Sequence, residues 1–342
     1  MSDSFGTFTS AYEQLFVDVF DRPDFEPAPR GMRVKEVLCK RFTLEDPLDR
    51  LPYVAARGFY ASYFVAESLF YLAALDSTEW IANYAPFWRD ITDDGKTATS
   101  AYGARIFRPH SRIASDVDPT WTQWQYVKDE LLRDPDSRRA VVHIRSPHDS
   151  ILAKKDVPCT LTLQFFLRDD LLHLVVSMRS SDLVLGLAYD VPAFTLIQEY
   201  MALQLTNDFG RPIGLGQYHH VSNSLHLYER HFEMAREVCD DLYKERFSSF
   251  RARRATIPKK MPAMTLPVPI EKLLWVEDRF RKSMTETELE RVINTAGSFD
   301  SDYWWDWVTI LASHRARKLK ASGLSSDLVN SLTFDGYKFF KR

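Results

Sequence analysis

The chain has 342 residues, of which 45% are hydrophobic and 27% are charged, and its formal net charge is −3. This is an ordinary globular balance, and it gives no electrostatic case for binding a nucleic-acid polymer or an anionic membrane. The length favours about two domains of roughly 150 residues, or one larger domain. An anionic ligand would therefore have to be bound by local arginines.

Cysteine usage and the N-terminal sequence indicate a reducing compartment. Cys39, Cys159 and Cys239 are an odd number without the spacing of a disulfide framework. The opening MSDSFGTF has neither the basic nor the apolar region of a secretory signal. Charges, Gly or Pro interrupt every apolar run before the roughly 18 residues that a membrane span needs. We therefore expect a cytoplasmic protein.

The first hundred residues predict an extended lead-in and then a buried helix. Residues 21–31 (DRPDFEPAPRG) are rich in proline and acid, so residues 1–24 are expected to be an N-terminal extension of a domain spanning 25–264. Residues 58–75 are long and apolar enough for a buried helix that contains Glu67. A buried acid is costly unless it is paired, which makes Glu67 a candidate site residue.

The middle of the chain alternates between helices and strands. Residues 122–144 predict a helix that ends at an Asp-Pro step, then a turn and a strand. Residues 159–167 and 171–179 predict two strands in a hairpin, and 192–210 predict a helix with Pro at its start and Gly after its end. Strict alternation places Cys159 and Gln164 on opposite strand faces, unless a bulge intervenes or the cysteine precedes the regular strand.

Residues 265–342 predict a helical C-terminal extension that is rich in aromatic and basic residues. Its tryptophans Trp304, Trp305 and Trp307 precede the basic segment SHRARKLK. Interleaved aromatic and basic side chains can stack nucleic-acid bases, so a non-catalytic nucleotide-binding or RNA-binding regulator is one hypothesis. A tryptophan cluster at helical spacing is more often part of a core or an interface.

Several separated motifs agree in order and spacing with one enzyme family. Pro158-Cys159 is followed by Gln164, by RSSDLVLGLAYD at 179–190 and by GLGQYHHVSN at 214–223. This order resembles the thymidylate synthase family, in which a Pro-Cys nucleophile precedes a Gln, an Arg-Ser-x-Asp-x-x-Leu-Gly-Leu signature ending in an aromatic-Asn pair, and a Gly-Asp-x-His-x-Tyr segment. The resemblance covers residues 25–235. It implies an α+β fold with a large mixed β-sheet packed against helices, a homodimer, 5,10-methylenetetrahydrofolate as cosubstrate, and no metal.

The resemblance also implies catalytic roles. Carbon 5 of a pyrimidine is a poor nucleophile until a group adds to carbon 6, and a thiolate, here Cys159, is well suited to make and later break that bond. Arg179, twenty residues further on, would favour this thiolate. By resemblance, Glu67 manages ordered water and proton transfer, and Tyr102 assists removal of the carbon-5 proton.

The remaining implied roles concern binding. The phosphate residues are Arg30, Arg179 and Ser180, with Arg138 and Arg139 from the other subunit. The other nucleotide residues are Gln164, Ser181, Asp182, Gly186, Asp190, His219 and Val221. The folate residues are Arg57, Trp88, Asp182 and Gly186. Alternatives to these roles are a solvated turn for Arg138 and Arg139 and a solvated helix start for Arg57.

One departure from the family bears on the choice of base. The aromatic-Asn pair is replaced by Tyr189-Asp190. An amide can donate to O4 and accept from N3 of uracil, whereas a carboxyl group can accept from the cytosine amine and, when protonated, donate to N3. The same Asp occurs in the cytidylate hydroxymethylase branch of the family, which includes the phage dCMP enzyme and the CMP enzyme of mildiomycin-type nucleoside antibiotic biosynthesis. In that branch, water rather than hydride takes up the exocyclic methylene.

Three further departures concern water, sugar and closure. Asp156 is polar where the synthases have an apolar residue, which is compatible either with admitting water or with a surface loop. Val221 replaces the family's Tyr, so a sugar contact is lost or is rebuilt by His220 or Ser222. The synthases' apolar closing peptide at the C-terminus is replaced by FDGYKFFKR.

The sequence therefore predicts a folate-dependent 5-hydroxymethylase of cytidine monophosphate, with CMP favoured over dCMP. The alternative within the family is a methylating synthase that acts on dUMP or dCMP.

Overall fold

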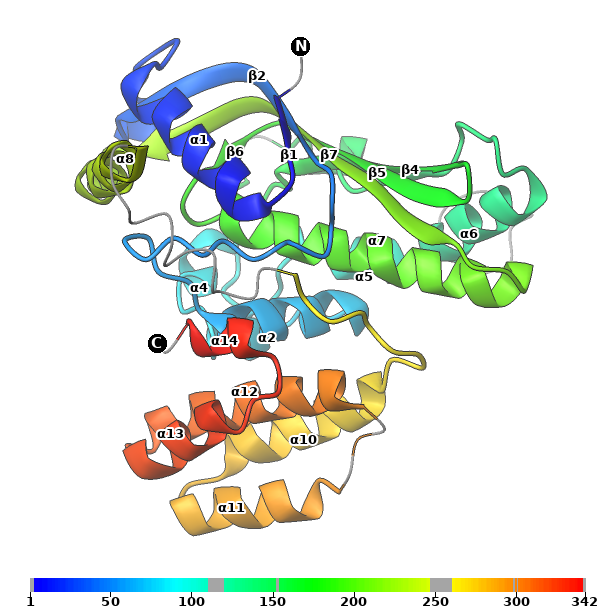
Figure 1. Cartoon of the computed structure of the whole chain (residues 1–342), viewed down its shortest axis with the longest axis vertical. Coiled ribbons are helices and arrows are strands. Elements are labelled where there is room, and N and C mark those ends of the chain that lie inside the picture. Colours follow the sequence, from blue (N-terminus) through cyan, green and yellow to red (C-terminus); the bar gives the residue numbers. More distant parts are fainter. Residues whose placement is uncertain are drawn as a thin grey trace.

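A mixed β-sheet lies at the centre of the computed structural model, which describes residues 3–109, 120–151, 154–246, 260–297, 299 and 301–340 (Figure 1). The strands follow the order β1 (Asp3–Phe5), β2 (Val34–Leu44), β7 (Gly214–Tyr228), β5 (Leu171–Met178), β4 (Thr160–Arg168) and β3 (Val141–His143). The short strand β6 (Ser181–Asp182) pairs with β7. Because β7 is antiparallel to β2 and parallel to β5, the sheet is mixed, as predicted.

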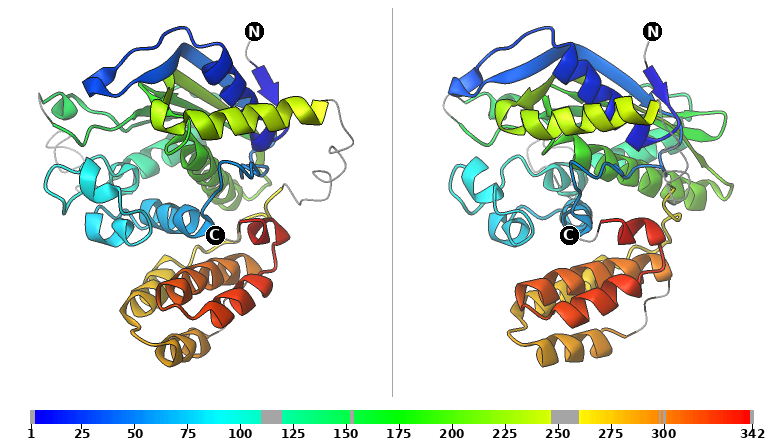
Figure 2. Two further views of the ribbon diagram at one scale, coloured as in Figure 1. Left: turned by 90° about the vertical axis from the view of Figure 1, so that its left-hand side faces the viewer. Right: turned by 60° about the vertical axis from the view of Figure 1, so that its left-hand side comes forward.

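Helices cover the sheet and form a second body at the C-terminus (Figures 1 and 2). The first set is α1 (Phe8–Asp21), α2 (Ala61–Leu72), α3 (Thr78–Ala82), α4 (Trp88–Ile91), α5 (Tyr102–Phe107), α6 (Gln123–Arg133), α7 (Leu187–Phe209) and α8 (Phe232–Arg246). The C-terminal set is α10 (Ile270–Lys282), α11 (Glu286–Thr295), α12 (Asp302–Lys318), α13 (Ser322–Asn330) and α14 (Asp335–Lys338). Short 3₁₀ turns occupy Pro29–Gly31, Pro147–Asp149 and Glu229–His231.

Helix α7 runs along the buried face of the sheet (Figure 1). Its Gln198 side chain fastens it there, since Nε2 donates to the Leu172 carbonyl at 2.8 Å and to the Gly216 carbonyl at 3.2 Å. Gly210 ends the helix in the left-handed conformation, at φ 64°, as its position in the sequence predicts. The helix begins at Leu187, ahead of the predicted start at Pro192, because a turn built on Asp182 leads directly into it.

Cys159 and Gln164 lie on opposite sides of the sheet, although β4 contains a bulge. The pairing of β4 with β5 shifts register between Thr160 and Thr162, and Cys159 precedes the first residue of the strand. After the bulge, Leu163 and Phe165 face the buried side, and Gln164 faces the other side. A bulge inserts one extra residue on one strand, which inverts the facing of every later side chain.

The first 24 residues belong to the catalytic body, contrary to the predicted N-terminal extension. Strand β1 pairs parallel with β2 and extends the sheet. Helix α1 buries Phe8, Tyr12 and Phe16 completely. The prediction relied on the proline-rich segment 21–31 as a boundary, but this segment connects two elements of the same core.

The helical extension packs on α2, the helix that carries Glu67 (Figure 2). The Trp307 ring of α12 meets the Phe64 ring of α2 edge-on at 6.5 Å, and both side chains are fully buried. Arg315 of the basic segment donates to the Ser283 carbonyl and Lys318 to the Asn83 carbonyl. Trp304 is also buried, so these tryptophans form a core rather than an exposed base-stacking surface.

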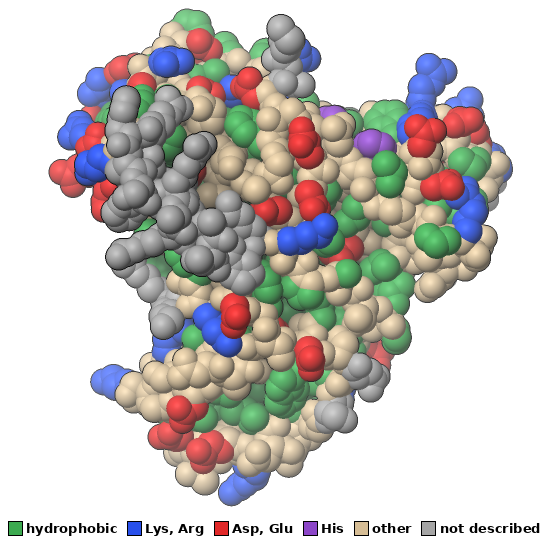
Figure 3. Space-filling model, viewed as in Figure 1, with side chains coloured by type: hydrophobic (Ala, Val, Ile, Leu, Met, Phe, Trp, Pro, Cys, Tyr) green, Lys and Arg blue, Asp and Glu red, His purple; other side chains and the backbone are tan. Residues whose placement is uncertain are grey.

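The described surface offers no membrane-crossing element. No described helix is both long and apolar enough to span a bilayer. On the face in Figure 3, acidic and basic side chains are interspersed.

A buried ion pair ties the catalytic body to the segment that leads into the extension. Arg50 Nη2 lies 2.7 Å from Glu199 Oε2, and the two side chains are 0% and 4% exposed. Glu199 Oε1 also accepts from the Met264 backbone N–H at 2.7 Å. Removing one partner of such a pair leaves an uncompensated buried charge.

We expect Arg50→Met to lower the free energy of unfolding by about 3–5 kcal/mol, because Glu199 loses its counter-charge. The double variant Arg50→Met/Glu199→Gln should lose less. The exposed pair Arg33–Glu26 provides a control, and Arg33→Met should cost less than about 1 kcal/mol. Urea denaturation measures all three, and equal losses for the two arginine variants would contradict the assignment.

Candidate active site

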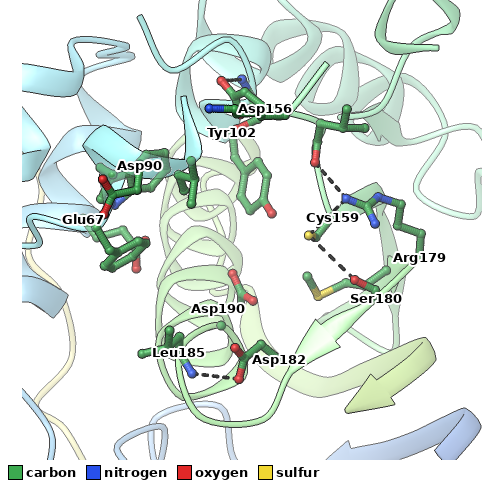
Figure 4. A pocket seen from close by; sticks show the side chains of 18 of the residues that line it. Glu67, Asp90, Tyr102, Asp156, Cys159, Arg179, Ser180, Asp182, Leu185 and Asp190 are labelled. Atoms are coloured by element: carbon green, nitrogen blue, oxygen red, sulfur yellow. Dashed lines mark hydrogen bonds between the residues drawn. The ribbon is translucent and has the colours of Figure 1, made fainter. Parts of the chain in front are cut away.

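A pocket of about 340 Å³ opens where α2, α4, α5, the start of β4 and the start of α7 converge. It brings together eleven of the residues singled out in the sequence: Arg30, Glu67, Trp88, Tyr102, Asp156, Cys159, Arg179, Ser180, Asp182, Gly186 and Asp190. In Figure 4, Cys159, Arg179 and Ser180 form one wall, Glu67 and Asp90 the opposite wall, and Asp190 lies between them. The pocket therefore places a thiol, a guanidinium and several carboxyl groups around one space.

Cys159 lies beside a guanidinium that the backbone holds in place. Its Sγ is 3.5 Å from Arg179 Nη2 and 3.9 Å from the Ser180 hydroxyl. Arg179 also donates to the carbonyls of Pro158 and Val157, both at 2.9 Å. Burial raises the pKa of the Cys159 thiol, and the Arg179 guanidinium opposes this rise. Arg179 thus lowers the pKa of Cys159, as expected, but burial raises this pKa by more.

Glu67 is oriented by two aromatic side chains. Tyr63 donates its hydroxyl hydrogen to Glu67 Oε1 at 2.7 Å, and the same hydroxyl accepts from Trp88 Nε1 at 3.1 Å. Glu67 Oε2 has no hydrogen-bond partner among the described residues. Burial raises the pKa of Glu67 to about 8, with a further contribution from Asp190, whereas the Tyr63 hydrogen bond lowers it. At neutral pH this side chain is therefore a carboxylic acid with one oxygen available.

Asp190 is buried in the first turn of α7. Its carboxyl group makes no hydrogen bond to a described residue. Burial, followed by the nearby Asp182 charge, raises its pKa to about 7. A Cβ at Gly186 would lie only 3.2 Å from Asp190 Oδ2, so glycine at this position avoids a steric conflict with the carboxyl group.

Asp182 shapes the turn before α7. Its Oδ1 accepts from the backbone N–H groups of Val184 at 2.8 Å and Leu185 at 3.1 Å. This side chain-to-backbone turn directs the chain into the helix. Asp182 therefore has a structural role as well as a place in the pocket wall.

Tyr102 enters the pocket from the first turn of α5. Figure 4 shows it reaching toward the space between Cys159 and Asp190. The close approach of α5 to α2 depends on Gly103, since a Cβ there would lie 2.2 Å from the Tyr71 carbonyl oxygen. Burial raises the pKa of Tyr102 well above its ordinary value, so its phenol remains protonated.

Three predicted nucleotide residues lie on the other face of the sheet. Gln164, His219 and Val221 are partly exposed, in register with Val175 and Ser177 of β5. The structure therefore does not bring them to the pocket. The physical reason is the two-residue alternation of a strand, which the bulge in β4 shifts.

Arg138 and Arg139 also lie outside the pocket of their own chain. Both side chains are exposed, and neither forms an ion pair with a described residue. The Arg138 carbonyl accepts from Gln164 Nε2 at 3.0 Å. Their position leaves their side chains available to another molecule.

Ser181 and Arg57 are inside the protein rather than on the pocket wall. Ser181 belongs to a buried network in which Ser222 donates to it at 2.7 Å and His220 Nε2 lies 3.3 Å away. Burial lowers the pKa of His220 to about 3, so it is neutral. Arg57 stacks on the Tyr189 ring at 4.9 Å and donates to the carbonyls of Gly58 and Val184. Neither Ser181 nor Arg57 faces the pocket, and the network also buries His220 and Ser222.

An adjoining groove of about 450 Å³ contains residues that the sequence analysis missed. It shares Arg30, Lys155, Val157, Arg179 and Ser180 with the pocket, and its further lining includes Glu36, Arg145, Lys154, Ser224, His226 and Tyr228. HLY at 226–228 has an intact His-x-Tyr spacing and is a second match to the family segment that we expected at His219 and Val221.

Asp156 lines the pocket, and its carboxylate is already hydrogen-bonded there. Its carboxylate accepts from the Thr99 hydroxyl at 3.0 Å and from the Ser100 backbone N–H at 3.2 Å, and the side chain is buried. These bonds join the segment before Cys159 to the loop before Tyr102.

In the described part of the chain, no group of three or more His, Cys, Asp or Glu residues is arranged to hold a metal ion.

The raised pKa of Glu67 predicts a pH-dependent stability. Between pH 5 and pH 8 the unfolded chain has an ionised Glu67, whereas the folded chain keeps it protonated, so the free energy of unfolding falls as pH rises. Glu67→Gln should abolish about 3 kcal/mol of this fall. Urea denaturation at pH 5 and at pH 8 measures this fall in the free energy of unfolding, and Glu290→Gln, at an exposed position, serves as the control. Equal slopes for the wild type and Glu67→Gln would refute the prediction.

Comparison with known proteins identifies the family of this chain. A family model described as thymidylate synthase matches residues 10–259. A deoxyuridylate hydroxymethyltransferase of Bacillus phage SP01 is 28% identical over 288 residues, which cover 82% of this chain and 70% of the relative. A thymidylate synthase of Haloferax volcanii is 24% identical over 241 residues, which cover 65% of this chain and 68% of the relative. The chain therefore belongs to the thymidylate synthase family of one-carbon transferases, which use methylenetetrahydrofolate to modify pyrimidine nucleotides.

Proposed function

We propose that this enzyme hydroxymethylates carbon 5 of a cytidine monophosphate, with CMP favoured over dCMP. The observation that carries the proposal is the buried carboxyl group of Asp190, which makes no hydrogen bond to a described residue and whose pKa burial raises to about 7. It occupies the place of an amide in the family's aromatic-Asn pair.

A carboxyl group and cytosine pair well because they share one proton. The carbonyl oxygen of Asp190 accepts from the cytosine amine, and its hydroxyl donates to N3. A neutral carboxyl also has a donor and an acceptor for uracil, but O4 of uracil is a much weaker base than N3 of cytosine. Cytosine can therefore form charge-assisted hydrogen bonds with this carboxyl group, whereas uracil cannot.

The same proton serves the chemistry. As the Cys159 thiolate adds to carbon 6, electron density moves toward N3, and Asp190 supplies the proton that N3 takes up. When bound, the folate supplies a one-carbon unit to carbon 5. Tyr102, on the pocket side near Cys159, assists loss of the carbon-5 proton as tetrahydrofolate leaves and the exocyclic methylene forms. Glu67 Oε2 orients the water that adds to the exocyclic carbon, and the bond between carbon 6 and Cys159 then breaks to return the thiolate.

The mouth of the pocket fits the flat, partly apolar ring system of a folate. Phe87 and Trp88 line it, together with Ile91 and Leu185, which are 41% and 36% exposed. Exposed apolar side chains beside a polar pocket are typical of a binding surface. Arg57 is committed to Tyr189 and backbone carbonyls, so another group must meet the folate tail.

The nucleotide phosphate is assigned to Arg30, Arg179 and Ser180, and the sugar to His226 and Tyr228 in the adjoining groove. Arg138 and Arg139 reach this phosphate from a second copy of the chain in a homodimer. This part of the proposal is supported by the unpaired, exposed state of both arginines and by the partly exposed second face of the sheet beside them.

A second candidate is 5-hydroxymethylation of deoxyuridylate. It is favoured by the phage relative, which is a deoxyuridylate hydroxymethyltransferase at 28% identity. The methylating alternative is favoured by the Haloferax thymidylate synthase, which is 24% identical.

Incubation with methylenetetrahydrofolate and CMP, dCMP, UMP or dUMP separates these functions. We expect a product with the mass of a hydroxymethyl derivative from the cytidylates, with CMP the better substrate. Cys159→Ser should lose nearly all turnover, because the hydroxyl is a much weaker nucleophile. Turnover of uridylates alone, or a methylated product, would sink the proposal.

Asp190→Asn tests the choice of base directly. The amide donates to O4 of uracil and accepts from its N3–H. We therefore expect kcat/KM for cytidylate to fall, and the ratio of kcat/KM for uridylate to that for cytidylate to rise. A bidentate base contact is worth about 1–3 kcal/mol, so the ratio should move by about 5- to 150-fold. Asp129→Asn is the control, since it makes the same change at an exposed carboxyl outside the pocket. An unchanged ratio in Asp190→Asn would contradict the role of Asp190.

A further inference from the structure

The end of the C-terminal extension meets a row of aromatic rings that leads to Glu67. Phe340, just after α14, lies 4.7 Å from the Phe59 ring. Phe59 stacks on Tyr189 at 4.8 Å, and Tyr189 meets Tyr63 edge-on at 4.6 Å. Rings at these separations are in direct contact. A continuous row of packed side chains thus joins the last described residue to the pocket.

The last ring in the row holds the Glu67 carboxyl. Tyr63 donates to Glu67 Oε1 at 2.7 Å, and this bond fixes which oxygen is free. The Tyr189 hydroxyl accepts from the Tyr60 backbone N–H at 3.1 Å, which holds its ring against Tyr63. A shift of Tyr189 or Tyr63 would therefore turn the carboxyl group.

The first ring in the row is itself held firmly. Asp306 of α12 accepts from the Thr333 backbone N–H at 2.8 Å, the Thr333 hydroxyl at 2.9 Å and the Phe334 backbone N–H at 2.9 Å. Phe340 then stacks on Tyr53 at 5.1 Å and is 7% exposed. The extension thus presents Phe340 to Phe59 in a fixed position.

We propose that Phe340 is a positioning residue for Glu67, through Phe59, Tyr189 and Tyr63. The extension, which packs on α2 and ends beside its N-terminus, keeps the carboxyl in its working orientation. This inference rests on the proposed role of Glu67 in handling water, and it makes the extension part of the active-site architecture.

Phe340→Ala and Phe339→Ala form a matched pair for the test. Phe339 is 36% exposed and contacts Tyr53 and Phe340, outside the row that leads to the pocket. With the nucleotide that the wild type turns over best, we expect Phe340→Ala to lower kcat about tenfold or more, with a smaller change in KM. The alkaline limb of its kcat–pH profile should move to higher pH, because a weaker hydrogen bond from Tyr63 lets the pKa of Glu67 rise. Phe340→Leu, which refills the space, should recover part of kcat.

A double-variant cycle with Tyr63→Phe separates positioning from general loss of structure. Tyr63→Phe keeps the ring and removes the hydrogen bond to Glu67, so its effect on the pH profile should not add to that of Phe340→Ala. Additive effects, or a Phe340→Ala profile equal to that of Phe339→Ala, would overturn the proposal.

A measurement without substrate keeps this test independent of the proposed function. The pH dependence of stability reports the pKa of Glu67 in the folded chain. Phe340→Ala should change that dependence in the wild-type background and leave it unchanged in Glu67→Gln. If no nucleotide is turned over but this coupling is present, the proposed function fails and the positioning stands. If the coupling is absent, the positioning fails whatever the substrate.

Discussion

The structure depends on keeping several carboxyl groups in a small apolar space. Glu67, Asp182 and Asp190 all line the pocket, and burial raises the pKa of Glu67 to about 8 and that of Asp190 to about 7. Burial and repulsion from neighbouring carboxyl groups disfavour the charged forms of Glu67 and Asp190, so the folded chain favours protons on these two groups. These protons are available for chemistry at neutral pH, and the fold must supply enough surrounding structure to offset the burial.

That surrounding structure explains the extra helices. All residues of α2, including Glu67, are buried, which a helix on the rim of the catalytic body could not achieve alone. Helix α12 covers its outer face through Trp307 and Phe64, and α7 covers another face. The buried acid Glu277 of α10 accepts from Trp80 Nε1 at 2.8 Å and from Tyr84 at 3.1 Å, which joins the extension to α3 and the residues just after it. The extension thus provides the low-polarity surroundings that Glu67 requires.

The sequence predicted what local chemistry determines and missed what depends on register. Motifs whose spacing is visible in the chain led to the mixed-sheet fold, to the helical extension and to the cluster of Cys159, Arg179 and Asp190. The facing of Gln164 depends on a bulge, which no residue type announces. His219 and His226 of β7 are an odd number of residues apart and therefore face opposite sides of the sheet, but the sequence does not show which side lies near the pocket. Arg57 has the right charge near the right place, but its burial against Tyr189 is set by tertiary packing.

The two carboxyl groups that frame the pocket are linked through their charges. Asp190 raises the pKa of Glu67, after burial, so an ionised Asp190 favours a protonated Glu67. In the proposed reaction, Asp190 gives its proton to N3 of cytosine, and the charge on the base balances the new carboxylate, so the pKa of Glu67 changes little. Without such a base, the same ionisation would leave an uncompensated charge beside Glu67. An asparagine at this position would remove this proton exchange and leave the pKa of Glu67 to burial and its hydrogen bonds. Under the proposed function, base choice and proton handling are therefore coupled, because Asp190, which recognises N3, also changes the pKa of Glu67, which orients the water.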